Sequence, residues 1–249
     1  MVSLSGKTMI VIGGSRGIGR RIVEAGIRNG AQVLAVARRE APLRQLVHDV
    51  PGVEILALDA TDEDAPSKVF DVLMPDILII GGGVFPPAAP IHEQSWQQFS
   101  ANWEGDVKIA FNFCKAALSR PLSACASVVL LSSGAALVGS PLSGGYAGAK
   151  RTQIFIANYS QKESDRLALG LRFISVAPRI VPDTDLGKRA IIGYSRYLGI
   201  SSNDLVRSMA APPTSCNVAT AVVELVLNPD RSLGDVFIVS GKGLEAIAA

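Results

Sequence analysis

Short apolar runs alternate with longer amphipathic segments along the whole chain. Seven of the runs are continuous and rich in β-branched residues, as is typical of strands buried on both faces of a sheet. These runs are residues 8–12, 32–37, 53–58, 77–80, 127–131, 172–177 and 236–239. One helical pattern lies between each pair of runs, at about 17–29, 41–49, 62–73, 95–119, 145–169 and 215–227. This alternation predicts a single α/β domain over residues 1–249, with a doubly wound parallel sheet and helices on both faces.

Two stretches interrupt this rhythm, residues 84–90 and residues 182–213. Both follow the carboxyl end of a predicted strand, where open α/β sheets bind their ligands. We therefore expect them to form walls of a cleft, with 182–213 as a lid over the substrate. The alternatives are ordinary surface loops and, for the second stretch, a pair of helices that packs on the core.

Composition narrows the possible partners. The chain has 249 residues, of which 48% are hydrophobic, and its mean hydropathy is +0.31. Such a sequence suits a sheet covered on both faces and a buried subunit interface. The net charge of +2 is too small to indicate nucleic-acid binding, and the chain has no basic run. We expect a homo-oligomer, a dimer or tetramer, and no nucleic-acid partner.

Cysteine and histidine usage bears on the compartment and on metals. The three cysteines are widely separated, which is typical of reduced thiols in a cytoplasmic protein. The two histidines have no cluster of acids beside them, so we expect no catalytic metal. No apolar run approaches the roughly 18 residues of a membrane span, so neither membrane insertion nor secretion is expected.

The candidate chemistry lies in the segment 132–150. Tyr146 and Lys150 are four residues apart, so on a helix they share one face. A nearby cation lowers the pKa of a phenol from about 10, which makes the pair a candidate acid/base centre. Such a pair also occurs on solvated helices. However, Ser133 stands at a strand end thirteen positions before the tyrosine, and this spacing resembles the signature of the short-chain dehydrogenase/reductase family. The same spacing selects Ser133 over its neighbour Ser132.

A glycine-rich loop follows the first predicted strand. Its spacing, with glycines at 13, 17 and 19, is similar to that of the same family and differs from Gly-x-Gly-x-x-Gly. The glycines permit a tight turn and close backbone approach to a pyrophosphate, which the amino end of the next helix attracts. Ser15, Arg16 and Ile18 belong to the same loop.

The type of nicotinamide cofactor is expected to depend on the end of the second strand. NAD sites place an acid there, whereas a 2′-phosphate requires cations. This chain has Arg38 and Arg39 and no acid at the strand tip, and Arg16 adds a third guanidinium. Guanidinium groups match phosphate geometry, so we expect NADP(H), the alternative being arginines that only solvate a loop.

The resemblance implies a Rossmann-type fold and further cofactor-binding positions. Asp59 corresponds to the family's adenine-contacting acid, with a helix cap for the segment from Asp62 as its structural alternative. The remaining positions are Ala60, Gly81, Gly82, Gly83, Tyr146, Lys150, Pro178, Arg179, Ile180 and Thr184. The chain departs from the family at Ile12, Ile80 to Gly82, Arg179 and Ser240, and Arg179 replaces a glycine in a turn.

By the same resemblance, Tyr146 exchanges a proton with the substrate oxygen and Ser133 orients that oxygen. Lys150 lowers the pKa of Tyr146 and binds the nicotinamide ribose. Asn102 completes the set by holding a water that connects Lys150 to solvent, the alternative being a capping or buried amide. The implied function is an NADPH-dependent oxidoreductase acting between a ketone or aldehyde and a secondary alcohol. The alternative is a nucleotide-binding sensor or scaffold with little turnover. The helical patterns at 95–119 and 145–169 are expected to form a four-helix subunit interface in a homotetramer.

Overall fold

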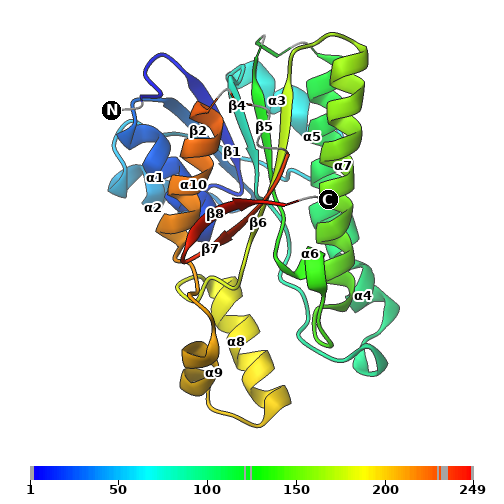
Figure 1. Cartoon of the computed structure of the whole chain (residues 1–249). Helices are drawn as coiled ribbons and strands as arrows, with labels where there is room; N and C mark the ends of the chain where they lie inside the picture. Colours follow the sequence, from blue (N-terminus) through cyan, green and yellow to red (C-terminus); the bar gives the residue numbers. More distant parts are fainter. Residues whose placement is uncertain (1–2, 121, 124, 229, 231–234, 248–249) are drawn as a thin grey trace.

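The protein is built on one sheet of eight strands in the order β3-β2-β1-β4-β5-β6-β7-β8 (Figure 1). The computed structural model describes residues 3–120, 122–123, 125–228, 230 and 235–247. The strands are β1 Thr8–Ile12, β2 Gln32–Ala37, β3 Glu54–Ala57, β4 Ile77–Ile80, β5 Ser127–Leu131, β6 Arg172–Pro178, β7 Val236–Ser240 and β8 Gly243–Ala246. Neighbours from β3 to β7 pair in parallel, and β8 pairs antiparallel with β7.

Ten α-helices lie in the described part of the chain. They are α1 Gly17–Arg28, α2 Glu40–Asp49, α3 Ala65–Val72, α4 Trp96–Asn102, α5 Lys108–Ser119, α6 Ala135–Val138, α7 Gly144–Arg166, α8 Asp185–Leu198, α9 Ser202–Ser208 and α10 Ser215–Leu227. A 3₁₀ turn spans Ile91–Glu93, and a π-helical turn, Trp103–Val107, joins α4 to α5.

The predicted fold class is confirmed, and five of the predicted features need correction. The sheet has an eighth strand, because the chain turns back at Gly243 and pairs with β7. The third strand is shorter than expected. The helix expected at 62–73 begins only at Ala65, and the helix expected at 95–119 is interrupted by the π turn. The expected loop after Ser133 contains α6. The single domain over 1–249 stays a prediction, and residues 1–2, 121, 124, 229, 231–234 and 248–249 of it lie outside the described residues.

Two apolar layers sandwich the sheet. Side chains alternate along β1, so that Met9 and Val11 enter one layer while Ile10 and Ile12 enter the other. Helices α1, α2 and α10 cover the first face, and α3, α5 and α7 cover the second (Figure 1). Burial on both faces explains why the strands read as continuous apolar runs.

The order of the strands locates the ligand site. From β1 the chain moves outward to β2 and β3, and then returns to place β4 on the other side of β1. The loops after β1 and β4 therefore leave the sheet in opposite directions and open a crevice at the carboxyl ends of these strands.

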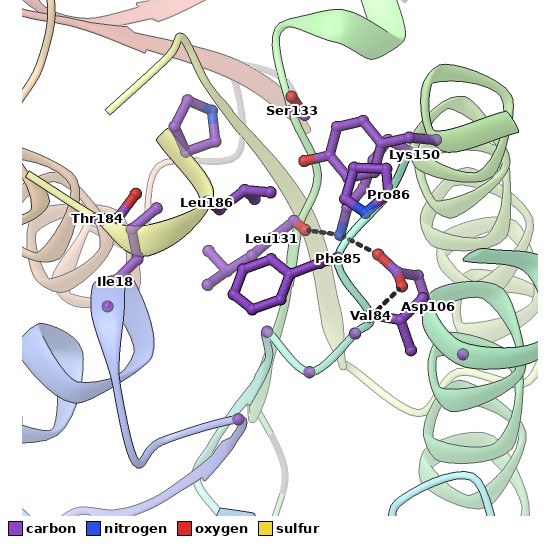
Figure 2. Close-up of a pocket in the computed structure, with 18 of the residues that line it drawn as sticks. Ile18, Val84, Phe85, Pro86, Asp106, Leu131, Ser133, Lys150, Thr184 and Leu186 are labelled. Carbon is purple, nitrogen blue, oxygen red and sulfur yellow. Dashed lines mark hydrogen bonds and ion pairs between the residues drawn. The ribbon is translucent and has the colours of Figure 1, made fainter. Parts of the chain in front are cut away.

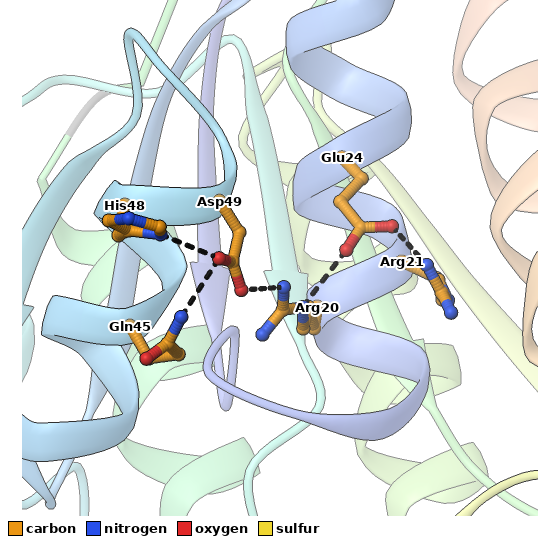
Figure 3. Close-up of polar contacts among 6 residues, drawn as sticks. All are labelled: Arg20, Arg21, Glu24, Gln45, His48 and Asp49. Atoms are coloured by element: carbon orange, nitrogen blue, oxygen red, sulfur yellow. Dashed lines mark hydrogen bonds and ion pairs between the residues drawn. The ribbon is translucent and has the colours of Figure 1, made fainter.

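A polar cluster ties α1 to α2 (Figure 3). The Arg20 guanidinium donates to Glu24 at 2.9 Å within α1 and to Asp49 of α2 at 2.7 Å. His48 and Gln45 also contact the Asp49 carboxylate, at 3.0 and 2.8 Å. These hydrogen bonds lower the pKa of Asp49, that from Arg20 contributing most. The cluster links the helix that follows the glycine loop to the helix that follows Arg39.

Three further findings concern the described residues. None of their helices combines the length and apolar character that a membrane crossing requires. No group of three or more histidine, cysteine or acidic side chains among them is arranged to hold a metal ion. The cysteines, Cys114, Cys125 and Cys216, are free, and burial raises the pKa of the Cys114 thiol to about 12.

Candidate active site

A cavity of about 970 Å³ opens at the carboxyl ends of the strands. Its walls come from the segments that follow β1 to β6, so residues from most of the chain meet there. Phe85 reaches it from the β4 side, while Thr184 and Leu186 face it from the start of α8 (Figure 2). Both stretches expected to form cleft walls therefore line the cavity.

The glycine loop packs directly on the segment after β4. Gly13 has φ +84°, and a Cβ atom there would lie 2.8 Å from the backbone nitrogen of Gly82. A Cβ at Gly19 would lie 2.3 Å from the oxygen of Gly13. Only glycine fits at both positions, and the backbone that they leave bare lines the cavity at the amino end of α1. This cradle fits the pyrophosphate of a dinucleotide.

Three arginines gather where the adenosine end of a dinucleotide is expected. Arg16, Arg38 and Arg39 all line the cavity and are exposed. The pKa of Arg16 is lowered, first by burial and then by the positive charge of Arg39, with Arg189 and Arg38 adding to the effect and Asp185 opposing it. Like charges so close together repel, and a bound anion relieves that repulsion. Glu40 follows Arg39 in the sequence, and its carboxylate forms an ion pair with Arg44 at 2.8 Å.

Further contacts of Arg16 join the glycine loop to Phe85 and to α8. Its guanidinium carbon lies 4.4 Å from the centre of the Phe85 ring, and that of Arg189 in α8 lies 4.1 Å from the same centre. Arg16 also lies 3.8 Å from a carboxylate oxygen of Asp185. The sequence indicated Phe85 and Arg189 only as members of the two stretches expected to form cleft walls, since neither residue belongs to a motif.

Asp59 lies at the cavity edge and shapes its own turn. One of its carboxylate oxygens accepts hydrogen bonds from the backbone N–H of Thr61 at 3.0 Å and from its hydroxyl at 2.8 Å. Burial would raise the pKa of Asp59, but these bonds and the charges of Arg38 and Lys108 outweigh it, so the pKa is lowered. The alternative role as a helix cap is not realised, because α3 begins only at Ala65.

Thr184 and Arg179 adopt conformations that the sequence left open. Thr184 is the N-cap of α8: its hydroxyl accepts the N–H of Gly187 at 3.0 Å and donates to the oxygen of Val181 at 2.9 Å. Among the described residues, Cys125, Ala168 and Ala211 are the non-glycine residues with positive φ. Arg179 is not one of them, so its turn does not require the glycine of the family pattern.

Ser133 and Tyr146 meet at the other end of the cavity. Tyr146 lies in the first turn of α7, and the Ser133 hydroxyl, which follows β5, is close enough to lower the pKa of its phenol. Ser133 also accepts the N–H of Ala135 at 3.2 Å. Ser132 instead is buried and donates to the backbone oxygen of Lys150 at 2.8 Å. Both members of the predicted hydroxyl pair thus line the cavity, whereas Ser132 anchors β5 to α7.

Lys150 lies beneath the tyrosine, with its ammonium 5.7 Å from the centre of the Tyr146 ring. Three acceptors surround this ammonium at 3.0 Å, namely the oxygen of Leu131, Oε1 of Gln153 and a carboxylate oxygen of Asp106. Figure 2 shows the contacts with Leu131 and Asp106. They match the three N–H bonds of an ammonium. The resemblance implies that Lys150 contacts a ribose hydroxyl. For that contact to form, the ammonium has to break its interaction with one of these three acceptors.

Lys150 lowers the pKa of Tyr146 as expected, but other effects on the phenol are larger. Burial raises the pKa of Tyr146, and although Lys150 and Ser133 both lower it, they do not compensate, so the pKa is raised overall. Asp106 and Tyr194 add to the increase. For Lys150, burial acts to lower the pKa, but Asp106 and Tyr146 outweigh burial and raise it. The lysine therefore acts on the phenol in the predicted direction, but with its charge partly balanced by Asp106.

Comparison with known proteins matches this arrangement to a family. The model of the short chain dehydrogenase family matches residues 7–192, about three quarters of the chain. The chain belongs to the short chain dehydrogenase family. It is 30% identical to human L-xylulose reductase over 105 residues, which is 42% of this chain and 43% of that protein. It is 32% identical to bovine L-fucose dehydrogenase over 134 residues, 52% and 50% of the two chains. It is also 34% identical to chicken D-erythrulose reductase over 89 residues, 36% of each. The matches span half or less of these relatives.

Asn102 does not reach Lys150 directly. It is fully buried at the end of α4, and its amide donates to the oxygen of Val84 at 3.0 Å and to Asp106 at 3.2 Å. Asp106 lies between Asn102 and the ammonium. Asn102 is not among the residues that line the cavity. Its expected role in holding a water for proton relay stays a prediction.

The wall around the hydroxyl pair is mostly apolar. The side chains that line it include those of Pro86, Pro87, Leu137, Val138, Leu142, Leu186 and Ala190. Tyr194 of α8 also lies there, and its hydroxyl is hydrogen-bonded to that of Ser140. Val138 is 91% exposed although it lines the cavity, so it offers an apolar surface at the mouth.

Proposed function

We propose that the protein is an NADPH-dependent oxidoreductase that interconverts a ketone or aldehyde and a secondary alcohol. The observation that carries the proposal is that the hydroxyls of Ser133 and Tyr146 share one cavity with a backbone cradle for a dinucleotide. Membership of the short chain dehydrogenase family supports it, because that family uses NAD or NADP.

Each residue of the pair has a distinct task in carbonyl reduction. Bound NADPH supplies a hydride from C4 of its nicotinamide ring. The Tyr146 hydroxyl donates a proton to the substrate oxygen, and in alcohol oxidation its phenolate takes that proton back. The Ser133 hydroxyl donates a hydrogen bond to the same oxygen and stabilises the charge that develops there. Lys150 holds a positive charge below the phenol, which favours its ionised form.

The preference for NADPH is supported by charge at the end of β2. Arg38 and Arg39 follow that strand, are exposed and line the cavity together with Arg16. Such guanidinium groups can bind a 2′-phosphate through charge-assisted hydrogen bonds.

The apolar wall around Tyr146 favours an apolar carbonyl compound as the substrate. Ser140 and Tyr194 hydrogen-bond one another. The side chains of Leu137, Leu142 and Leu186 offer a substrate hydroxyl no partner. Hydroxyl groups of a sugar would lose their bonds to water there without replacement, at a cost of about 1–3 kcal/mol for each unsatisfied group. The substrates therefore differ from those in the names of the relatives, L-xylulose, L-fucose and D-erythrulose.

The test is NADPH consumption by the purified protein across a panel of carbonyl compounds. Aryl and cyclic ketones represent apolar substrates, and L-xylulose and D-erythrulose represent polar ones. We expect the apolar ketones to have the higher kcat/KM, and Tyr146→Phe to lose turnover with all of them while still binding NADPH. Consumption with the sugars alone would contradict the apolar preference. Consumption with none would contradict the enzyme function.

One observation favours the second candidate function, a nucleotide-binding sensor or scaffold. Lys150 has all three of its N–H bonds directed at protein acceptors, and its charge is balanced by Asp106. A lysine so engaged supports proton transfer less than a free one. A sensor would bind NADPH equally in the wild type and in Tyr146→Phe and would oxidise it in neither.

Assembly and compartment complete the proposal. Exposed aromatic side chains on α5 and α7, Phe111, Phe155 and Tyr159, support a homo-oligomer that buries these two helices, as in a tetramer with four-helix interfaces. The free cysteines support a reducing compartment, the cytoplasm.

A further inference from the structure

Asp106 is a buried carboxylate that belongs to no motif of the chain. It lies in the π-helical turn Trp103–Val107, and only 2% of its surface is exposed. A π turn adds one residue to a helix and redirects the side chains beside it, and such turns are frequent at functional sites. Here the turn brings a negative charge to 3.0 Å from the Lys150 ammonium.

The carboxylate is held by donors from three segments. Its Oδ1 accepts the backbone N–H of Val84 at 3.0 Å and the amide of Asn102 at 3.2 Å, while its Oδ2 faces Lys150. Gln153 of α7 donates to the Asp106 backbone oxygen at 3.0 Å. A Cβ atom at Gly83 would lie 2.5 Å from Oδ1, so the bare backbone of that glycine makes room for the carboxylate. This is a built site, because a buried charge is tolerated only when it is paired and hydrogen-bonded.

We propose that Asp106 is a positioning residue: it holds the Lys150 ammonium in place and limits how strongly that charge stabilises the Tyr146 phenolate. Its meaning for catalysis rests on the proposed oxidoreductase function. The effect of Asp106 on the Tyr146 phenol does not depend on that function, because the effect follows from the charges of Asp106 and Lys150 alone.

The groups that face Tyr146 come from four segments. Lys150 lies on the same helix, Asp106 in the π turn, Tyr194 in α8, and Ser133 after β5. Lys150 and Ser133 favour the phenolate, whereas Asp106 and Tyr194 disfavour it. Of the two opposing groups, Asp106 is the one that is ion-paired to the lysine. With the carboxylate in place, Tyr146 stays protonated to higher pH, and the protonated phenol is the form that donates a proton in carbonyl reduction.

The deciding experiment is an ultraviolet absorbance titration of the Tyr146 phenolate, which requires no turnover. The chain has four tyrosines, so the signal of Tyr146 is obtained by subtracting the titration of the same protein with Tyr146→Phe. Asp106→Asn removes the charge while keeping the shape of the side chain. We expect it to lower the midpoint of the Tyr146 titration by about one pH unit, the scale of one nearby charge.

Gln153→Met is the matched control, because it removes a neutral partner of the same ammonium and a hydrogen bond to Asp106 without changing charge. It should not lower the midpoint. Asp106→Glu, which restores the carboxylate, should return the midpoint toward the wild-type value. If circular dichroism shows that Asp106→Asn does not fold, Asp106→Ser carries the same expectation.

An unchanged midpoint in the folded, charge-removing variant would overturn the proposal, as would an equal shift in Gln153→Met. Turnover is measured separately on the same proteins. A lowered midpoint in a protein without turnover would leave the role of Asp106 standing and remove the oxidoreductase function. If the wild type is active but Asp106→Asn leaves the midpoint unchanged, the oxidoreductase function stands and the proposed role of Asp106 is removed.

Discussion

The side-chain oxygen of Ser132 lies 2.8 Å from the backbone oxygen of Lys150, to which it donates a hydrogen bond. This contact joins the end of β5 to α7, and it turns Ser132 away from the role that its neighbour Ser133 is proposed to fill. Two adjacent serines thus provide a matched pair for separating support of the fold from chemistry.

Substituting each serine by alanine should have different effects. Ser133→Ala removes a hydrogen-bond donor to the substrate oxygen, so kcat/KM should fall by about 10²- to 10³-fold, as for the loss of one oxyanion donor. Ser132→Ala removes a buried hydrogen bond, so the free energy of unfolding should fall by about 1 kcal/mol, with a much smaller loss of activity. Steady-state kinetics and urea denaturation of both variants measure the two effects. The reverse pattern would assign the chemistry to Ser132.

The arginines at the end of β2 should discriminate between the two cofactors. Arg38→Ala is expected to weaken NADPH binding by about 1–3 kcal/mol, the scale of a charge-assisted hydrogen bond, and to leave NADH binding nearly unchanged. Fluorescence titration with each cofactor measures this. Arg44→Ala is the control, because Arg44 is equally charged but is paired with Glu40. Equal losses for NADPH and NADH would argue against a phosphate contact.

The polar cluster between α1 and α2 should make stability depend on pH. The pKa of Asp49 is lowered from its ordinary value of 3.8, chiefly by its hydrogen bond to Arg20. A lowered pKa means that the folded state favours the ionised form, so this contribution is complete above the ordinary value and is lost as the pH falls below it. Asp49→Asn should therefore lower the unfolding midpoint at neutral pH, and the difference from the wild type should shrink in acid.

Glu163→Gln is the control for that measurement, because Glu163 pairs with Arg166 within a single helix and joins no two elements. It should change the unfolding midpoint less than Asp49→Asn does. A difference between wild type and Asp49→Asn that stays constant down to the most acidic pH would show that the carboxylate charge is not what joins the two helices.

The proposed subunit interface can be tested on α7. The rings of Phe155 and Tyr159 stack with their centres 6.2 Å apart, and 43% and 63% of these side chains are exposed. Phe155→Glu places a charge on this apolar surface, so it should dissociate a dimer or tetramer into smaller species in sedimentation velocity. Val47→Glu is the control, because Val47 is also exposed but lies on α2, outside the proposed interface. It should leave the assembly intact. A wild-type protein that sediments as a monomer would remove the interface.

The sequence predicted the fold well where burial leaves a simple pattern. Strands β1, β2, β4 and β5 begin and end at the predicted residues, because a strand covered on both faces is apolar throughout. The antiparallel β8 was not predicted, since its four residues are mostly exposed and carry no such pattern. The π turn was not predicted either, because the helical pattern of 95–119 continues through it.

The candidate site was predicted as far as its residues belong to motifs. The glycines, Ser133, Tyr146 and Lys150 all line the cavity, since their spacing depends on the fold itself. Asp106 was missed, because a single carboxylate has no spacing to identify it. One signal was available: Asp106 lies four residues after the buried Asn102 and four before the buried Ala110, and a charge on the buried face of a helix requires a partner. The raised pKa of Tyr146 follows first from burial and then from the charge of Asp106, neither of which the sequence displays.

The most direct test of the central claim follows a deuterium atom. NADPH in which deuterium replaces both hydrogens at C4 of the nicotinamide ring is supplied with an apolar ketone, and the alcohol product is analysed by mass spectrometry. The account predicts that the wild type transfers one deuterium to the former carbonyl carbon. It predicts that Tyr146→Phe binds the cofactor but transfers deuterium about 10²- to 10⁴-fold more slowly, the usual contribution of a general acid. Equal rates of transfer by the two proteins, or an alcohol that contains no deuterium, would contradict it.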